Sequence, residues 1–240
     1  MTAPTPPRLS LIIPALNAAQ SLDATLDAAL DTALRVTGDA PAALDLDLVV
    51  IDGGSTDATR ATAQARGARL FESAPGRGRQ LAAGARHADA DWLLFVHADT
   101  RLPAHWADVV TRFIADPLNA ERAGYFRLRF DVSSAGARRV AALANWRART
   151  FGLPYGDQGL LIHRTLYDAV GGYGDLALME DVELVRRIGP MRLRPLPATV
   201  VTSAAKYQTG GWWARPARHL ACLALYLAGA PQGWIERLYR

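Results

Sequence analysis

Apolar and polar positions follow two periods along the first half of the chain. Short apolar runs of strand length are separated by segments in which apolar residues recur at helical spacing. In the first such segment, Leu22, Leu26 and Leu30 form one face and Asp23 and Asp27 the other, as in an amphipathic helix. The predicted strands are 9–15, 45–52, 68–73 and 91–98, and the predicted helices are 21–36, 57–66, 78–88 and 103–115. Alternating strands and helices indicate an α/β fold with a mostly parallel central sheet flanked by helices.

The second half has a different pattern. In the run 124–131, Phe126, Leu128 and Phe130 alternate with Arg127 and Arg129, which predicts a strand with one wetter face. The elements expected after it are a helix over 135–149, a short strand before Arg164, an acidic helix start near 180 and, after the unassigned segment 191–203, a final amphipathic helix. This half therefore departs from the regular strand–helix alternation of the first.

Carboxylates follow two of the predicted parallel strands. Asp52 ends one strand and is followed by Gly53 and Gly54, and Asp99 follows another after His97. Ligands of parallel sheets bind outside the carboxyl ends of the strands, so the fold itself directs these side chains to a crevice. A carboxylate at Asp52 can accept a hydrogen bond from a base N–H, while the glycines let backbone approach a ligand. An ordinary strand–turn–helix with an N-cap has the same pattern.

Asp99 is the candidate metal ligand. Mg²⁺ and Mn²⁺ take few carboxylates together with phosphate oxygens and waters, so one aspartate beside a diphosphate is enough. His97 is a second candidate ligand, although a histidine at the end of a strand also serves as an ordinary structural residue.

The segment "PGRGRQLAAGARHA" combines glycines with basic residues at a helix start. Arg77, Arg79 and Gln80 are suited to holding a diphosphate, with help from the helix N-terminus. The segment has neither the dinucleotide-binding glycine pattern nor that of a Walker loop. A surface loop with ordinary arginines is the alternative.

Two further acidic sites lie in the second half. Asp157 and Gln158 stand between two glycines just before an apolar strand, and Glu180, Asp181 and Glu183 cluster at a helix start. Neighbouring carboxylates repel, and burial raises the pKa of a carboxyl group, which suits a general base. A solvated, acid-rich helix start is the alternative for the cluster.

The amino-acid composition limits the class of protein and the cellular compartment that the chain suits. The 240 residues, half of them hydrophobic, suit one globular enzyme domain. The single cysteine, Cys222, allows no internal disulfide, and with a proline-rich start that lacks a signal peptide it indicates the cytoplasm. Basic residues concentrate after position 182, as a solvated face or as a tail that meets phosphates or an anionic membrane. The apolar run 220–230 is too short to span a bilayer.

Taken in order, these motifs resemble those of the family 2 glycosyltransferases, which have the GT-A fold. The forms "HADT" and "GDQG" are similar, more narrowly, to the bacterial subgroup called rSAM/selenodomain-associated transferase 2. The resemblance covers about residues 8 to 240. The matching segments are "SLIIPALN", "IDGGSTDAT", "GRGRQLAAGA", "LLFVHADTRLP", "GDQGLLIHR" and "MEDVELVRRI".

The resemblance implies roles for the residues on the donor side. Pro14 and Asn17 would lie beside the nucleoside, and Asp52, with Gly54 in its turn, would bind the base. Arg79 would reach toward the nucleotide or the diphosphate. A UDP- or GDP-linked sugar would be the donor.

The resemblance also implies the catalytic groups. Asp99 would bind Mg²⁺ or Mn²⁺, and Asp181 would be the base, with Glu180 orienting the acceptor or the loop. His97 departs from the family, which usually begins this motif with an aspartate. Near the C-terminus, "KYQTGGWW" offers only Lys206, Gln208 and Trp212 in place of a longer diphosphate-binding motif. Trp212, like Asp157 and Gln158, is expected on the acceptor or diphosphate side.

The sequence thus predicts an inverting, metal-dependent hexosyltransferase that acts on an acceptor hydroxyl, in one domain. Its expected parts are a nucleotide-binding half over 8–122, an acceptor and catalytic half over 123–205, and amphipathic helices over 206–240. Residues 212–229 are expected to contact a membrane surface or to pack on the protein. No nucleic-acid partner is expected. The alternatives are a nucleotide-sugar-binding module without turnover and a sugar-phosphate nucleotidyltransferase.

Overall fold

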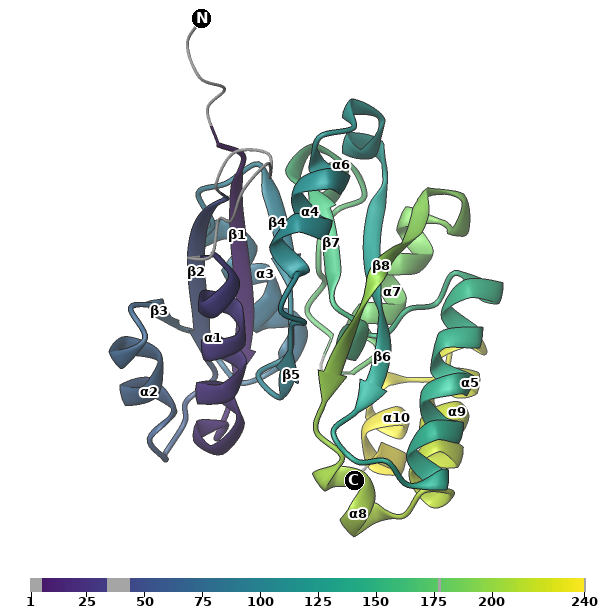
Figure 1. The fold of residues 1–240 in the computed structure, drawn as a ribbon. Helices are drawn as coiled ribbons and strands as arrows, with labels where there is room; N and C mark the ends of the chain where they lie inside the picture. Colours follow the sequence, from purple (N-terminus) through teal and green to yellow (C-terminus); the bar gives the residue numbers. More distant parts are fainter. Residues whose placement is uncertain (1–5, 34–43, 177, 240) are drawn as a thin grey trace, which may run out of the picture.

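The computed structural model describes residues 6–33, 44–176 and 178–239. The proline-rich start over 1–5 and the end of the first predicted helix, 34–36, lie outside the described residues. Strands and helices alternate through the first half (Figure 1). That half contains β1 (Arg8–Ala15), α1 (Ala19–Ala33), β2 (Asp45–Asp52), α2 (Thr59–Ala65), β3 (Arg69–Glu72), α3 (Arg77–His87), β4 (Trp92–Phe95), β5 (Thr100–Arg101) and α4 (Trp106–Ile114).

The second half contains three further strands and the helices that follow α4. A 3-10 turn, η1 (Pro117–Glu121), leads into it. Its elements are β6 (Ala123–Phe130), α5 (Ala135–Phe151), η2 (Gly156–Gln158), β7 (Leu160–His163), α6 (Arg164–Ala169), α7 (Glu180–Ile188), η3 (Pro190–Arg192), β8 (Leu193–Thr202), α8 (Ala205–Gly210), α9 (Ala214–Leu227) and α10 (Gln232–Tyr239).

The strands of the described residues form one mixed sheet in the order β3-β2-β1-β4-β7-β6-β8-β5. The strands β1 to β4 pair in parallel with one another, as do β6 and β8. The strand β7 runs antiparallel to both of its neighbours, and β5 runs antiparallel to β8. The carboxyl ends of β1, β2 and β4 therefore meet at one edge of the sheet, beside β7.

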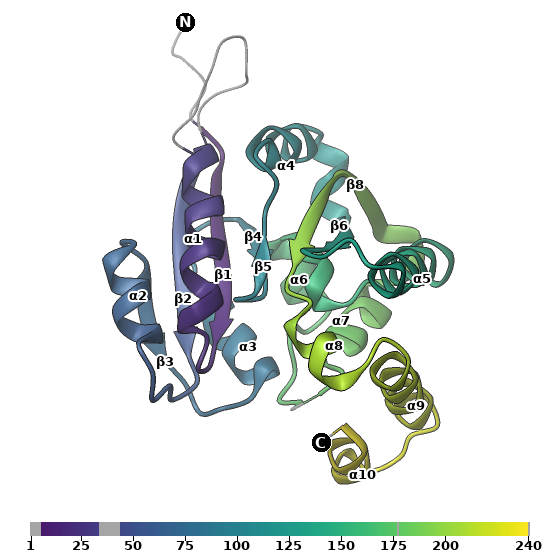
Figure 2. The same ribbon diagram turned by 60° about the horizontal axis from the view of Figure 1, so that its bottom comes forward.

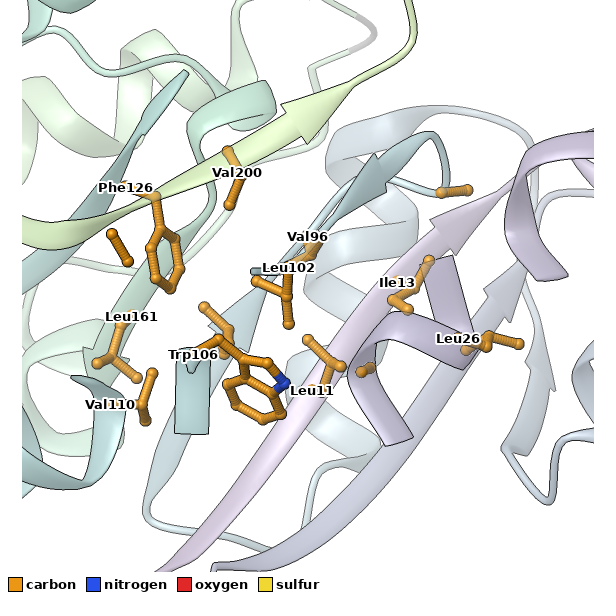
Figure 3. Packing of buried hydrophobic residues seen from close by; sticks show 14 of the residues in the cluster. Leu11, Ile13, Leu26, Val96, Leu102, Trp106, Val110, Phe126, Leu161 and Val200 are labelled. Atoms are coloured by element: carbon orange, nitrogen blue, oxygen red, sulfur yellow. The ribbon is translucent and has the colours of Figure 1, made fainter. Parts of the chain in front are cut away.

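The central core lies on both faces of this sheet. On β1, Leu9, Leu11 and Ile13 pack into one cluster with α1 and α4, whereas Ile12 packs into another with α3. This is the two-sided burial expected of a parallel strand. Figure 3 shows the first cluster, in which Leu11 and Phe126 come from different halves of the chain. One continuous core thus joins the two halves.

The C-terminal helices α8, α9 and α10 lie together at the end of the molecule where α5 also runs (Figure 2). The residues that anchor α9 and α10 form a separate small core with α7, made of Met179, Val182, Cys222, Leu223 and Ile235. The predicted amphipathic tail is therefore packed against the protein on one side. Within the described residues, no helix combines the length and apolarity required to cross a bilayer.

Most elements match the sequence prediction, and β2 matches it to the residue. The strand β5 was not predicted, because its two residues are a strand only through their pairing with β8. The wetter face predicted for β6 is confirmed at Arg127 and Arg129, which are exposed, while Tyr125 on the same face is buried in the second core cluster.

Close packing of α3 on the sheet depends on a glycine. A Cβ added at Gly84 would come within 2.2 Å of Ile12 Cγ2 on β1. We expect Gly84→Ala to lower the free energy of unfolding by ~1–3 kcal/mol, since overpacked cores must shift backbone or side chains. Urea unfolding measures the loss. Gly233→Ala, whose added Cβ meets no atom within 4 Å, is the matched control; equal effects of the two substitutions would contradict the packing argument.

Candidate active site

Two loops at the carboxyl edge of the sheet are hydrogen-bonded to each other. The Oδ1 of Asn17, after β1, accepts from the backbone N–H of Thr56 at 2.9 Å, and the N–H of Asn17 donates to Ser55 Oγ at 2.9 Å. Asn17 has a φ of 48°, a left-handed conformation that asparagine tolerates better than most residues. The two loops predicted to hold the nucleoside therefore form one unit.

Asp52 ends β2 with its side chain almost fully buried. Its carboxylate accepts from the backbone N–H of Ser55 at 3.1 Å and from that of Gly54 at 3.3 Å. Gly54 has a φ of 93°, which favours glycine. Pro14 is buried in β1 opposite Ile51 of β2. The carboxylate thus shapes its own turn, and its predicted contact with a base stays a prediction.

Asp99 faces a cation in the structure. Lys206 of α8 donates to its Oδ2 at 3.1 Å. Burial raises the pKa of Asp99, but the charge and hydrogen bond of Lys206, together with the nearby His97 and Arg77, outweigh this effect and hold the pKa below its ordinary value. Asp99 is therefore a carboxylate that already carries a bound positive group.

His97 is the second polar side chain after β4. Its Nε2 is buried and has no hydrogen-bond partner among the described residues, and a Cβ at Gly156 would come within 2.3 Å of it. Burial, aided by the positive charge of Arg77, lowers the pKa of His97 to about 3. The imidazole is therefore neutral at physiological pH, which is the form that binds metals.

The acidic cluster at the start of α7 divides into different environments. Glu180 is 1% exposed and forms an ion pair with Arg77 at 3.4 Å, whereas Asp181 Oδ2 accepts from the backbone N–H of Gly156 at 2.8 Å. Burial raises the pKa of Glu180 to about 7, and the negative charge of Asp181 adds to this. Met179, just before the cluster, has a left-handed φ of 66°. The acidic cluster is thus not a simple solvated helix start.

One cavity of about 540 Å³ joins the ends of the central strands to α5, α8 and α9. The polar side chains that line it include four predicted site residues, His97, Asp99, Asp157 and Asp181, together with Arg77 and Lys206. Burial raises the pKa of Asp157 to about 6, and its Oδ1 has no hydrogen-bond partner within the described residues. The cavity therefore collects carboxylates from three separate segments of the chain.

The other predicted residues do not line this cavity. Pro14, Asn17, Asp52 and Gly54 lie at the ends of β1 and β2, and Glu180 lies behind Asp181 in α7. Their predicted roles remain predictions.

Arg79, Gln158 and Trp212 have contacts of their own. The guanidinium of Arg79 is paired with Asp175. Gln158 is buried and donates to Phe126 O at 3.1 Å. The ring of Trp212 stacks on the ring of Tyr207, with the ring centroids 5.2 Å apart. Of the residues in these contacts, Tyr207 alone lines the cavity, and the roles predicted for Arg79, Gln158 and Trp212 in donor or acceptor binding stay predictions.

Other residues of the cavity wall have weaker signals in the sequence. The sequence suggests both Arg77 and Arg79 for the diphosphate, and in the structure it is Arg77 that lines the cavity. Arg147 and Tyr155 form a cation–π contact at 3.3 Å in the wall. The signal for Arg147 was weak, because it is one of several arginines on an alanine-rich helix. Only the tertiary structure separates it from the rest.

The residues at the end of β4 fit a divalent cation completed by phosphate. In the described part of the chain, no three His, Cys, Asp or Glu side chains form a group that could hold a metal ion alone. Asp99 already binds an ammonium group, and the neutral, unpartnered Nε2 of His97 lies two residues before it. A diphosphate would supply the missing oxygen ligands.

Sequence comparison assigns the family. The family model described as "Glycosyl transferase family 2" matches residues 10–150, which is more than half of the chain. The chain therefore belongs to glycosyl transferase family 2. No curated protein matches the chain.

Structural comparison agrees with a GT-A fold. A mannosyltransferase from Pyrobaculum calidifontis, PcManGT in complex with GDP-Man and Mn²⁺, is 22% identical with a TM-score of 0.65, over 98% of this chain and 69% of that chain. TarS 1-349 from S. aureus is 14% identical with a TM-score of 0.60, over 97% and 69%. Glucosyl-3-phosphoglycerate synthase from Mycobacterium tuberculosis, in complex with Mn²⁺ and UDP-Glc, is 19% identical with a TM-score of 0.56, over 94% and 80%.

The buried Glu180 gives a pH-dependent contribution to stability. Its raised pKa means that the folded state binds a proton that the unfolded state releases between about pH 4.5 and 7. This contribution is complete below pH 4.5 and is lost as the pH rises to about 7.

Glutamine at position 180 cannot ionise. We therefore expect the free energy of unfolding of Glu180→Gln, relative to that of the wild type, to increase by on the order of 1–3 kcal/mol as the pH rises through that range. Urea unfolding at half-unit pH steps measures the difference. Glu121→Gln, at an exposed glutamate, should keep the wild-type profile. A Glu180→Gln profile parallel to that of the wild type would contradict the raised pKa.

Proposed function

We propose that this chain is an inverting, divalent-metal-dependent glycosyltransferase that moves a hexosyl group from a nucleotide sugar to an acceptor hydroxyl. The observation that carries the proposal is the cavity shared by Asp99 and Asp181, in a chain of glycosyl transferase family 2. Asp99 comes from the turn between β4 and β5, and Asp181 comes from α7. The two carboxylates have separate environments, and this supports separate roles.

The donor is a UDP- or GDP-linked sugar. Structural neighbours are complexes with GDP-Man and with UDP-Glc, each together with Mn²⁺. The nucleoside lies against Pro14 and Asn17, and the base lies near Asp52 and Gly54. The linked loops after β1 and β2 support this assignment, because they make a preformed edge for a flat ring.

Asp99 would hold Mg²⁺ or Mn²⁺, with His97 as a second ligand and the donor diphosphate supplying further oxygens. When bound, the cation supplies charge stabilisation of the leaving nucleoside diphosphate. Arg77 and Lys206, which line the same cavity, add positive charge to that side, and Arg79 serves the nucleotide from the start of α3. Fixed positive groups placed where negative charge develops stabilise the transition state.

Asp181 is the general base. It takes the proton of the acceptor hydroxyl as that oxygen attacks the anomeric carbon, and the bond from this carbon to the diphosphate oxygen breaks. The hydrogen bond from the Gly156 N–H to Oδ2 fixes the carboxylate, so that its orientation is set before the acceptor arrives. Attack opposite to the leaving group inverts the anomeric configuration. Glu180 orients the segment behind the base through its pair with Arg77.

This mechanism gives each part of the chain a different role. Residues 8–122 bind the donor, residues 123–205 supply the acceptor site and the base, and residues 206–240 close the cavity. Lining residues from α8 and α9, such as Lys206 and Arg215, support the last assignment. Asp157, Gln158 and Trp212 serve the acceptor or diphosphate side, Asp157 directly and the other two by holding the wall.

Replacement of the base tests the mechanism. Asp181→Asn keeps the shape of the side chain but cannot take a proton, so we expect turnover to fall at least ~100-fold, within the range of general-base catalysis. Nucleotide affinity in the presence of Mn²⁺ should stay within about twofold, since the donor does not depend on this group. Transfer assays and calorimetry measure the two quantities. Lost donor binding in this variant would contradict the separate roles of Asp99 and Asp181.

Replacement of the metal ligands tests the cation site. We expect Asp99→Asn to abolish the part of UDP or GDP binding that depends on Mn²⁺, because it removes the charged ligand. His97→Ala should weaken it less, since a neutral ligand is easily replaced by water. Calorimetry with and without EDTA measures both effects. Full transfer activity in EDTA would remove the metal from the mechanism, and pyrophosphate release from a sugar phosphate and an NTP would favour a nucleotidyltransferase.

A further inference from the structure

We propose that the acceptor is an amphiphile, whose apolar part lies in the cleft between α5 and α9 while its hydroxyl reaches Asp181. This inference rests on the proposed glycosyltransferase function and adds the chemical class of the acceptor. It comes from the composition of the cavity, which changes from one end to the other.

The two ends of the cavity differ in polarity. The end at the central strands has the charged groups already described, including Asp99 and Asp181. The other end is lined by large apolar side chains from α5, from Trp213 and from α9, among them Leu143, Trp146 and Leu220. A nucleotide sugar is polar along its whole length, so it matches only the first end. An acceptor that fills both ends must be apolar in one part and polar in the other.

The apolar end is open to solvent. Leu143 is 60% exposed, Trp146 50% and Phe151 54% on α5, and across the cleft Trp213 is 71% exposed and Leu220 66%. Figures 1 and 2 both show α5 beside α9. Contiguous exposed apolar surface of this kind is unusual and marks a site of binding. Its continuity with the carboxylates identifies what binds there as a molecule that also reaches the catalytic end.

The sheet order separates this cleft from the nucleoside edge. Asp52 and Asn17 follow β2 and β1, on one side of β4, whereas Phe130 of β6 and Thr202 of β8 line the cavity on the other side. Asp99, which follows β4, lies between them in the strand order. Donor and amphiphile therefore approach Asp99 from different sides of the strand order, which leaves the face of the sugar opposite the diphosphate open to the acceptor.

Unpartnered nitrogen atoms line the region between these ends. Arg147 Nη2, Arg215 Nε and His219 Nε2 are buried without a hydrogen-bond partner among the described residues, and all three residues line the cavity. Buried polar atoms are nearly always paired in folded proteins. Oxygen atoms in the head group of the acceptor would satisfy them, which an alkyl chain alone could not do.

The test uses hexyl, heptyl, octyl and nonyl β-glucosides as probes, each below its critical micelle concentration. Binding to the full chain is followed by tryptophan fluorescence, because Trp146 and Trp213 line the cleft. We expect affinity to rise roughly threefold with each added methylene, in line with the transfer of apolar groups out of water. An affinity that is independent of chain length would overturn the proposal.

The variants are Leu143→Gln and Leu220→Gln, with Leu227→Gln as the matched control. Leu227 is on the same helix as Leu220 and is 50% exposed, but it does not line the cavity. We expect each cleft variant to weaken nonyl glucoside binding about tenfold, and the control to change it less than twofold. Equal effects at Leu220 and Leu227 would contradict the cleft.

Donor measurements separate this proposal from the one on which it rests. Hydrolysis of UDP-glucose and GDP-mannose with Mn²⁺, and nucleotide affinity, should be the same in the wild type and in all three variants. Donor hydrolysis without any amphiphile binding would overturn the acceptor class and leave the glycosyltransferase function intact. Amphiphile binding in a protein that neither binds nor hydrolyses a nucleotide sugar would instead overturn the proposed function.

A membrane surface or a second copy of the chain in the cleft would give different experimental results. If Leu143→Gln and Leu220→Gln reduce flotation with anionic phosphatidylglycerol vesicles but leave nonyl glucoside binding unchanged, the cleft is a membrane-contact surface and the proposal fails. If they convert a dimer into a monomer in light scattering without affecting the probe, the face is an interface between copies of the chain. Either result would replace the amphiphilic acceptor.

Discussion

The side-chain amide of Gln80 is the interaction on which the candidate site depends. Its Nε2 donates to Ala15 O at 2.7 Å and to Ile51 O at 2.9 Å, so one buried group satisfies carbonyls at the ends of β1 and β2. A Cβ at Gly53 would come within 3.0 Å of this amide, which explains a glycine directly after Asp52. With the two strand ends tied together from α3, the loops that follow them have fixed positions from which to form a binding edge.

The same helix also connects the sheet to α7. Arg77, three residues before Gln80, is paired with Glu180 and lines the cavity. Its positive charge favours a neutral His97 and opposes the effect of burial on Glu180. Two adjacent residues of α7 thus have different partners. Glu180 is paired with Arg77, and Asp181 accepts a hydrogen bond from the Gly156 N–H. The electrostatics of the site are therefore determined by contacts between segments that are far apart in the sequence.

How much the sequence could predict depends on whether the signal is local. The strand β2 and the position of Asp52 followed from an apolar run with a glycine stop, and Asp99 followed from the rule that parallel strands end at a crevice. The strand β5 could not be predicted, because its partner β8 lies about a hundred residues away in the sequence. Leu143 and Trp146 were equally out of reach, because exposed apolar residues on an alanine-rich helix acquire meaning only when α9 is known to lie opposite.

The ion pair between Lys206 and Asp99 balances the charge of the Asp99 carboxylate with a cation from the protein itself. Lys206 belongs to α8 and Asp99 to the turn between β4 and β5, so one ion pair fastens the C-terminal region to the central sheet. If Asp99 holds the divalent cation, as proposed, the cation would compete with this ammonium for the same oxygen, and Lys206 would then be free to meet phosphate oxygens. Any cation affinity measured for this chain includes the loss of that internal contact. On that proposal, a diphosphate bound with the cation would offer Lys206 a new partner, so Asp99 would bind the cation more readily with the diphosphate than without it.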